Sequence, residues 1–319
     1  MRKGLSLNMS IKIPIAEPNI GELERKYLLE AYDSGWISSK GSFIERFEEK
    51  FAEWLGVNFA ITCGNGTQAL HLACLAIGIK SGDGVSVTQD SYYACENVLK
   101  IIGAEKHLVS RDYEIIVHNY GYVSQIYFTI GCIEDCSEAL GSKHEGKLVG
   151  TSVAISTFSF YGNKTMTTGE GGMVCTNNPE YARKIRHLKN QCMLEPYIHD
   201  GVGYNYRMTN LQAAIGLAQL ERVEELLDKK RFITTLYSKN LNQEKFKAPK
   251  PIENSDPVLW MNVFEVDNQV KFRRYMEANG IETRPGFNPA QNLVMLPSGT
   301  TLTKEQVLDV CKISNSYYR

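Results

Sequence analysis

The strongest constraint on the fold is an alternation of short apolar runs with amphipathic segments along the first two thirds of the chain. Strand-like and helix-like segments in alternation are typical of an α/β protein. Strands are expected at residues 59–62, 85–88, 151–160 and 171–177. Helices are expected at residues 22–34, 42–55, 68–77, 96–102 and 179–189.

The middle of the predicted sheet departs from this order. Residues 104–110, 114–120 and 126–135 all read as strands, but only a few residues separate one from the next. A crossover between parallel strands usually takes roughly 10 or more residues. The strands are therefore joined by short loops or lack covering helices.

Local signals mark several helix ends. Ser42 and Glu45 have the spacing of a capping box. Gly78 is expected to end the helix before it, because glycine readily adopts the left-handed conformation at a helix C-terminus. Thr209 is a good N-cap for one long amphipathic helix over residues 210–231.

The composition changes beyond about residue 231. A strand at residues 258–266 and helices at 270–279 and 304–314 indicate a smaller α+β region. We therefore predict a large α/β domain that includes the N-terminal segment, at residues 1–231, and a small C-terminal α+β domain, at residues 232–319.

Composition narrows the function classes. The 319 residues carry a formal net charge of -1, which gives no broad electrostatic footprint for nucleic acid or an anionic membrane. No run approaches the roughly 20 apolar residues of a membrane span, and no apolar run follows the two basic residues of MRKGLSLNMS. We expect a cytoplasmic protein with neither nucleic acid nor membrane as partner. The 8 scattered cysteines are expected to be buried, reduced thiols.

The stretch CGNGTQALHLA leads from a strand through a glycine turn directly into a helix. A helix N-terminus offers N–H groups and the positive end of the helix dipole to a phosphate. Gly66 would let the backbone approach closely, and Thr67 would add a hydroxyl. A tight turn with a helix cap explains the same residues, because neither a Walker loop nor GxGxxG is present.

Two acids follow an apolar strand in GCIEDCSEALG. Glu134 and Asp135 would lie at the C-terminal end of that strand, where open α/β sheets bind ligands. A carboxylate there could pair with a cationic ring nitrogen. Paired acids could also bind a metal, but no histidine has suitable spacing, so no metal is expected. A solvated acidic loop is the plain alternative.

A single lysine, Lys164, lies in the glycine- and threonine-rich stretch TFSFYGNKTMTTGEGG. A solvated loop lysine is the ordinary interpretation. A positioned, partly desolvated lysine can instead form a Schiff base with a carbonyl. Pyridoxal 5′-phosphate (PLP) would then need a phosphate site, an acid for its ring nitrogen and a flat partner. Gly66 with Thr67, Asp135 and the aromatics of DSYYACEN occur in an order compatible with one crevice.

Four motifs together resemble the DegT/DnrJ/EryC1/StrS family of PLP-dependent nucleotide-sugar aminotransferases, and within it the perosamine-synthase-like enzymes. The motifs are NGTQALHLACLAIG, IEDCSEALGS, STFSFYGNKTMTTGEGGMV and GYNYRMTNLQAAIGLAQLE. The resemblance runs from about residue 13 to residue 231, and more loosely to the end. It implies the type I, aspartate-aminotransferase-like fold, with a large mixed-sheet α/β domain and a smaller C-terminal α+β domain.

The resemblance also implies roles for single residues at the cofactor. Lys164 would carry PLP as a Schiff base and move the proton, and Asp135 would pair with the pyridinium nitrogen. Glu138 occupies the position near the phenolic oxygen, and Tyr92 the position of the aromatic that stacks on the ring. The phosphate would be held by the three residues Gly66, Thr67 and Ser159.

Other positions concern the partner subunit and the sugar. Asn205 would reach the phosphate of the neighbouring subunit, which makes a homodimer with shared active sites part of the mechanism. Trp36, Ser38 and Arg207 are candidates for the substrate side. A core aromatic, a loop hydroxyl and a structural ion pair are their respective alternatives.

The implied reaction moves an amino group from an amino acid, expected to be glutamate, to a nucleotide-linked keto sugar. The TTGEGG loop resembles those of enzymes that act at C4, whereas GDGG loops accompany action at C3. A 4-keto-6-deoxyhexose and its 4-amino-4,6-dideoxyhexose product, of the viosamine or perosamine type, are therefore expected. The alternatives are a C3-acting relative, a dehydratase relative, which has histidine in place of the lysine, and a non-catalytic protein of the same fold that binds nucleotide sugar.

The chain departs from the family pattern at three places. Segments are shorter between GAEKHLVS and IVHNYG, between HNYG and IEDC, where a helix is expected, and after RPGFNPAQN. None of these removes a residue named for the cofactor. The third touches a region that lies near the sugar and nucleotide in relatives.

Overall fold

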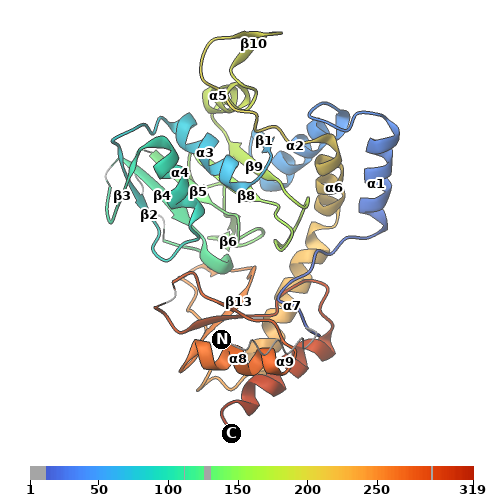
Figure 1. Cartoon of the computed structure of the whole chain (residues 1–319), viewed down its shortest axis with the longest axis vertical. Coiled ribbons are helices and arrows are strands. Elements are labelled where there is room, and N and C mark those ends of the chain that lie inside the picture. Colours follow the sequence, from blue (N-terminus) through green and yellow to red (C-terminus); the bar gives the residue numbers. More distant parts are fainter. Residues whose placement is uncertain (1–11, 111, 126–130, 289) are drawn as a thin grey trace, which may run out of the picture. The chain divides into compact units, whose positions relative to one another are not determined.

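The computed structural model of the chain describes residues 12–110, 112–125, 131–288 and 290–319 (Figure 1). The chain forms two compact units, neither of which is continuous in the sequence. The large unit comprises Pro18–Asp228 together with Pro251–Trp260. The small unit comprises the described part of Met1–Glu17, Lys229–Lys250 and Met261–Arg319. The division into domains at residue 231 stays a prediction.

The large unit is built on a seven-stranded sheet with the strand order β1-β9-β8-β5-β4-β2-β3. Its strands are β1 (Phe59–Cys63), β2 (Gly84–Val87), β3 (Glu105–His107), β4 (Tyr113–Val117), β5 (Gly131–Asp135), β8 (Ile155–Ser159) and β9 (Gly172–Thr176). β9 runs antiparallel to both of its neighbours, and the five strands from β8 to β3 are parallel. The sheet is therefore mixed, as expected.

Helices cover both faces of this sheet (Figure 1). They are α2 (Ser42–Leu55), α3 (Gly66–Ile77), α4 (Ala94–Ile102), α5 (Pro179–Lys189) and α6 (Asn210–Glu221), and α1 (Glu22–Asp33) packs against α6. Side chains alternate between the two faces along each strand. In β9, Val174 packs into the core shared with α3, α4 and α5, whereas Met173 and Cys175 pack into the core shared with α2 and α6.

The middle of the sheet lacks a covering helix in the described part of the connection from β4 to β5, which is one of the two outcomes that the sequence predicts. β4 and β5 are parallel neighbours, with Tyr113 opposite Gly131 and Val117 opposite Asp135. Within the described part of their connection there is only a 3-10 turn, Asn119–Gly121, and no α-helix. The predicted strand at residues 126–135 is confirmed for β5, and its first five residues lie outside the described ranges.

Short strands complete the large unit. β6 (Lys143–His144), β7 (Lys147–Leu148) and β12 (Ser255–Asp256) form a three-stranded sheet. β10 (Met193–Glu195) and β11 (Ile198–His199) form a hairpin, drawn beyond α5 in Figure 1. All eight cysteines are buried free thiols, as predicted. None of the helices in the described ranges is both long and apolar enough to span a bilayer.

The small unit has the α+β character expected of the C-terminal region. Its sheet has the order β13-β15-β14, and all neighbouring strands are antiparallel. The strands are β13 (Asn262–Glu265), β14 (Arg284–Pro285) and β15 (Leu293–Leu296), and the helices are α8 (Gln269–Ala278) and α9 (Lys304–Ser316). The buried aromatic rings of Tyr237, Phe246, Phe264 and Phe272 belong to its core.

Three predicted details are wrong. The helix predicted over residues 210–231 is two helices, because α6 ends at Glu221 and α7 (Val223–Asn240) begins after Arg222. The Arg222 guanidinium binds the buried carboxylate of Glu24 at 2.9 Å at this break. Thr209 nevertheless caps α6 as predicted, and Gly78 ends α3 in the left-handed conformation.

The other two errors concern α2 and the strand at residues 258–266. Gly41, not Ser42, is the N-cap of α2, and the Phe43 N–H donates to the Asn210 side chain at 3.1 Å. A distant side chain therefore replaces the local capping box. β13 begins only at Asn262, because residues 258–260 belong to the large unit.

Candidate active site

Lys164 lies in a tightly bonded loop between β8 and β9. The Lys164 N–H donates to the Tyr161 carbonyl at 2.9 Å, and the Phe160 carbonyl accepts from both the N–H of Thr168 and the hydroxyl of Thr167. The Lys164 side chain is only 13% exposed. A solvated loop lysine is therefore the wrong interpretation of this residue.

Two side chains contact the amine of Lys164. Glu138 Oε1 lies 3.3 Å from Lys164 Nζ, and the ring centroid of Trp260 lies 4.0 Å from it. Burial raises the pKa of the Glu138 carboxyl above its usual value, although the positive charge of Lys164 opposes the shift. The amine thus faces a carboxyl on one side and an aromatic face on another.

The glycine turn and the end of β8 form a corner suited to an anion. The Asn65 side chain caps α3 by accepting the Gln68 N–H at 2.9 Å. The N–H groups of Gly66 and Thr67 donate to no other group within the described residues. A Cβ at position 66 would lie 2.8 Å from Ser159 Cβ, so only glycine lets α3 begin this close to β8. Gly66, Thr67 and Ser159, predicted as one phosphate site, are together at this corner.

Asp135 is fixed beside this corner. It is the last residue of β5, is 6% exposed and pairs across the sheet with Thr157, two residues before Ser159. The Ser137 N–H donates to Asp135 Oδ1 at 3.0 Å, and the Cys95 thiol lies 3.8 Å from Oδ2. Burial, reinforced by the charge of Asp135, raises the pKa of the Cys95 thiol. The carboxylate is therefore a buried strand-end group and not part of a solvated loop.

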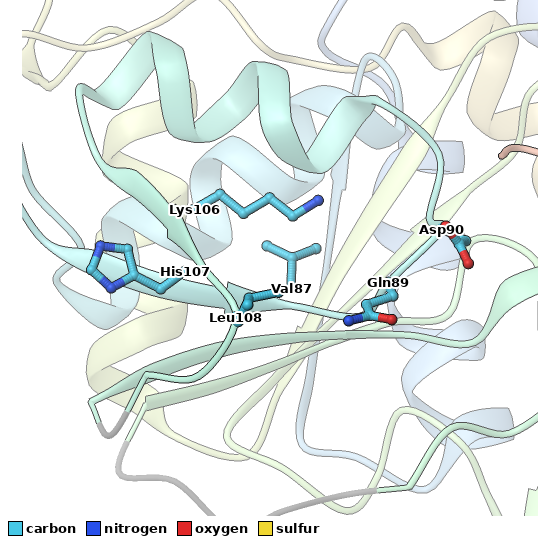
Figure 2. Close-up of a pocket in the computed structure, with 6 residues that line it drawn as sticks. All are labelled: Val87, Gln89, Asp90, Lys106, His107 and Leu108. Atoms are coloured by element: carbon cyan, nitrogen blue, oxygen red, sulfur yellow. The ribbon is translucent and has the colours of Figure 1, made fainter. Parts of the chain in front are cut away.

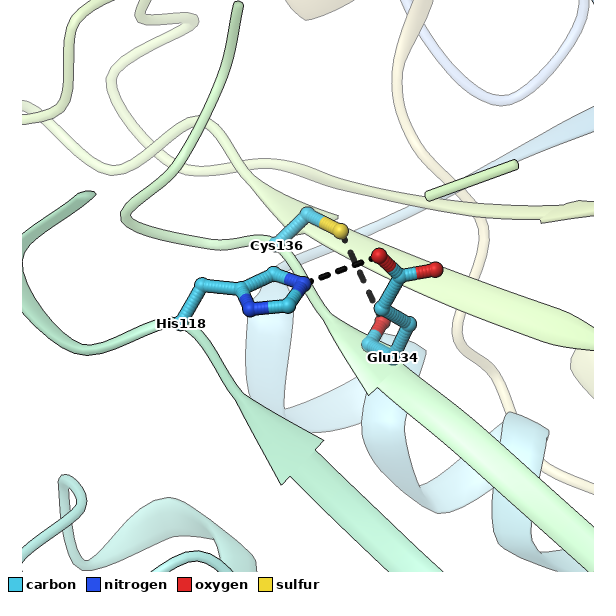
Figure 3. Close-up of side chains that lie close together, drawn as sticks. All are labelled: His118, Glu134 and Cys136. Atoms are coloured by element: carbon cyan, nitrogen blue, oxygen red, sulfur yellow. Dashed lines mark hydrogen bonds and ion pairs between the residues drawn. The ribbon is translucent and has the colours of Figure 1, made fainter. Parts of the chain in front are cut away.

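Glu134 points away from Asp135, because successive residues of a strand face opposite sides of the sheet. Its Oε1 accepts from Nε2 of the buried His118 at 2.8 Å, with Cys136 close by (Figure 3). The Ser124 N–H donates to His118 Nδ1, which leaves the proton on Nε2. The two acids are therefore not a paired ligand set. His118, the histidine partner that the sequence did not reveal, is bonded to Glu134 and not to Asp135.

Tyr92 follows β2. It is 61% exposed, in the loop between β2 and α4. An open cavity of about 270 Å³ lies at the carboxyl ends of β2 and β3, next to α4 (Figure 2). It is lined by Val87, Gln89, Asp90, Lys106, His107 and Leu108. Because β4 separates β2 from β5, this cavity is distinct from the surroundings of Asp135.

The remaining predicted residues lie on exposed segments. The guanidinium of Arg207 donates to Asn205 Oδ1 at 2.8 Å and to Asn190 Oδ1 at 3.1 Å, so it is held by amides and not by a described ion pair. Asn205 itself is exposed. Trp36 is 55% exposed, which excludes the core aromatic, and the exposed Ser38 accepts the Asn210 N–H through its carbonyl.

Comparison with known proteins identifies the family of the chain. The sequence profile of the DegT/DnrJ/EryC1/StrS aminotransferase family matches residues 18–120 and 127–316. The chain belongs to this family. It is 39% identical to GDP-perosamine synthase of Escherichia coli O157:H7, over 96% of this chain and 98% of that protein. It is 38% identical to GDP-perosamine synthase of Vibrio cholerae, over 96% and 99%.

Solved structures of other aminotransferases share the fold. Helicobacter pylori PseC, an aminotransferase of pseudoaminic acid biosynthesis, gives a TM-score of 0.88 at 21% identity, over 95% of this chain and 98% of PseC. Spr1654 from Streptococcus pneumoniae in its PLP form gives a TM-score of 0.86 at 20% identity, over 95% and 99%. The predicted fold of the type I PLP-dependent transferases is confirmed, and the chain is a PLP-dependent aminotransferase.

The residues of this DegT/DnrJ/EryC1/StrS member fit PLP. The corner at Gly66 offers N–H groups where a Cβ would close the space, Asp135 is a buried strand-end carboxylate, and Lys164 is a mostly buried amine. Sequence reasoning missed Trp260, which was expected to be part of a C-terminal strand. The sequence offers only a weak indication of this role, which is that a tryptophan, if buried, usually needs a hydrogen-bond partner for its indole N–H.

Proposed function

We propose that the chain transfers an amino group from glutamate to C4 of a nucleotide-linked 4-keto-6-deoxyhexose. The product is a 4-amino-4,6-dideoxyhexose of the perosamine or viosamine type. The observation that carries this proposal is the buried contact of Lys164 with Glu138, in a chain 39% identical to GDP-perosamine synthase along nearly its whole length. The TTGEGG sequence after Lys164 supports action at C4.

Bound PLP supplies an electron sink for the carbon that carries the amino group. Lys164 attaches the cofactor and, when free, carries a proton at Nζ to and from the substrate carbon. Gly66, Thr67 and Ser159 hold the phosphate with N–H and hydroxyl groups. Their positions on a helix and a strand end make this hold rigid.

The two carboxyl groups have different tasks. Asp135 would pair with the ring nitrogen and keep it protonated, and the bonds to Ser137 and Thr157 fix the orientation of its carboxylate. Glu138 would face the phenolic side of the ring, and it orients the Lys164 amine. Tyr92 would stack on the ring, and its exposed position in a loop allows it to meet an incoming ligand.

A second copy of the chain completes the site in this proposal. Asn205 is exposed and reaches the phosphate bound by the other subunit. The neighbouring hairpin supports such pairing, because apolar side chains clustered on a surface mark interaction sites. Its exposed apolar residues are Leu194, Tyr197, Ile198 and Val202. The homodimer acts in the cytoplasm, and Trp36, Ser38 and Arg207 contact the sugar nucleotide.

A substrate panel tests the reaction. Purified protein is incubated with glutamate and each of the GDP-, UDP- and dTDP-linked 4-keto-6-deoxyhexoses, and products are identified by mass spectrometry and NMR. We expect an amino group at C4 with at least one of them. A 3-keto isomer is the matched control, and amination only at C3 contradicts the C4 assignment. Binding without amino transfer favours the non-catalytic alternative.

A further inference from the structure

The segment Pro251–Trp260 returns from the C-terminal third of the chain to the large unit. Within it, β12 pairs with β6, so that Ser255 lies opposite His144. The Val258 N–H then donates to the Ser142 hydroxyl oxygen at 2.9 Å. Backbone bonds of this kind fix the path of the segment whatever side chains it carries.

The end of the segment is held against the loop at Asn119–Gly121. The Trp260 N–H donates to the Tyr120 carbonyl at 2.9 Å. Gly121 has a φ of 104°, and a Cβ there would lie 2.3 Å from the Val258 carbonyl oxygen. Only glycine permits this approach, and the approach sets the position of the Trp260 backbone.

The indole of Trp260 is fixed as firmly as its backbone. Its Nε1–H donates to the carbonyl of Asn163 at 2.7 Å, so the ring is tied to the residue just before Lys164. The ring is 5% exposed, and its centroid lies 4.0 Å from Lys164 Nζ. An ammonium ion over the face of an indole is attracted by the ring's quadrupole, most strongly for tryptophan among the aromatic residues.

These contacts close into a ring. Lys164 Nζ lies 3.3 Å from Glu138 Oε1, and Glu138 Oε2 accepts the Tyr120 N–H at 2.7 Å. The Tyr120 carbonyl accepts the Trp260 N–H, and the Trp260 ring lies against Lys164. The amine is therefore held between a carboxyl and an indole that share one backbone support.

We propose that Trp260 is a positioning residue for Lys164, and that its indole face holds the free amine inside the site and within reach of Glu138. The inference rests on the proposed role of Lys164 as the cofactor lysine. That lysine is free whenever the cofactor is bound to substrate instead. A long, flexible side chain would then gain entropy by moving into solvent. The indole opposes this movement into solvent and keeps Lys164 Nζ where a proton has to be transferred.

Acetic anhydride labelling of the cofactor-free, full-length protein at neutral pH tests this role, because the reagent reaches the Lys164 amine more readily when the side chain leaves its position, where it is only 13% exposed. Acetylation of Lys164 is measured by peptide mass spectrometry relative to the exposed Lys50 in the same sample. We expect Trp260→Leu to raise this ratio about threefold or more. Trp260→Phe should raise it less than Trp260→Leu does, because a benzene ring still attracts a cation, although more weakly than an indole. Trp54→Phe, which alters an indole on α2, is the matched control and should leave the ratio unchanged.

The outcomes separate this inference from the proposed function. Unchanged Lys164 labelling in both Trp260 variants, with thermal unfolding midpoints near that of the wild type, overturns the positioning role. If Trp260→Leu does not fold, the comparison of Trp260→Phe with the wild type decides in the same way. Borohydride trapping of the cofactor on Lys164 is scored separately in the wild type. Its failure would contradict the proposed function, while the labelling ratio would still report on Trp260.

Discussion

Glu134 and Glu138 lie four residues apart at the end of β5, and both are buried carboxyl groups, yet their surroundings differ. Glu134 accepts from the Nε2–H of His118, whose other nitrogen accepts a backbone N–H. Glu138 shares its carboxyl between a backbone N–H and the amine of Lys164. The first partner is locked in one tautomer, and the second carries an ionisable amine at the end of a flexible chain.

This difference indicates that Glu134 stabilises the fold and that Glu138 takes part in the reaction. His118 is wholly buried and offers no group for a substrate, so its bond to Glu134 stabilises the sheet between β4 and β5. This is the place where the described connection lacks a covering α-helix. Glu138 instead faces a lysine in a loop beside the anion corner, where a proton can be accepted and returned.

The largest expected effect on activity comes from removing the amine of Lys164, which pairs with Glu138. Lys164→Ala should reduce amino transfer by at least about a thousandfold, since the residue both attaches the cofactor and moves the proton. Product formation from the substrate panel measures the loss. Lys50→Ala, at an exposed position, is the control and should keep wild-type activity. Comparable activity of Lys164→Ala and the wild type would contradict the role of Lys164 in the reaction. Glu138 could then no longer be distinguished from Glu134 as the acid that serves the chemistry.

Removing the carboxyl of Glu134 should lower the stability of the fold. Glu134→Ala leaves His118 buried without its acceptor, which should lower the free energy of unfolding by about 2–4 kcal/mol. Urea unfolding of the cofactor-free protein measures this. Glu134→Gln keeps an acceptor oxygen of similar shape and should cost clearly less. A loss of activity in a stable Glu134→Gln variant would place Glu134 in the chemistry and contradict its structural role.

The conservative change Glu138→Gln should show the reverse pattern, with a large effect on turnover and a small effect on stability. Glu138→Gln should lower turnover by roughly 10- to 100-fold, because the amide cannot accept the proton or pair with the ammonium of Lys164. Its unfolding free energy should change less than that of Glu134→Ala. Steady-state kinetics and urea unfolding of the same preparation measure the two quantities. Full activity with strong destabilisation would interchange the roles of the two acids.

The pH dependence of stability should distinguish Glu138 in particular. Burial raises the pKa of Glu138 above its usual value of 4.5, so the folded protein binds a proton more tightly than the unfolded chain. The resulting stabilisation is fully present below the unfolded pKa and is lost as the pH rises through the folded pKa. The unfolding free energy of the cofactor-free wild type minus that of Glu138→Gln should therefore fall as the pH rises from about 4 to about 7. A constant difference would contradict the raised pKa.

The smallest effect is expected from the thiol beside Glu134. Cys136 is buried, and its Sγ lies 3.9 Å from the Glu134 carbonyl oxygen, so Cys136→Ala should cost about 1 kcal/mol of stability and no activity. Burial raises the pKa of this thiol well above its usual value, so iodoacetamide should not label it in the folded protein. Peptide mass spectrometry measures the labelling, and rapid modification at neutral pH would contradict the burial of this cluster.

The sequence predicted what depends on neighbouring residues. Thr209 and Gly78 mark helix ends through their own backbone preferences, and both predictions are confirmed. The alternative of short loops or missing covering helices in the middle of the sheet followed from a count of residues, and the described part of the connection between β4 and β5 has no α-helix. The corner of Gly66 and Ser159 was expected only through the resemblance, because two segments about 90 residues apart meet there.

Distant contacts explain what the sequence did not predict. The side chain of Asn210 supplies the acceptor at the start of α2, and Arg222 interrupts a continuous helical pattern by binding Glu24. His118 meets Glu134 because β4 and β5 are parallel neighbours. Trp260 reaches Lys164 through backbone bonds to Tyr120 and Ser142, which leave no local pattern in the sequence.

Reductive trapping tests the assignment of Lys164 most directly. The purified protein, loaded with PLP, is treated with borohydride, digested and mapped by mass spectrometry. The account predicts a yellow protein that loses its colour on reduction and a pyridoxyl group on the peptide that contains Lys164. An adduct on another lysine, or none on a protein that binds PLP, would contradict the assignment.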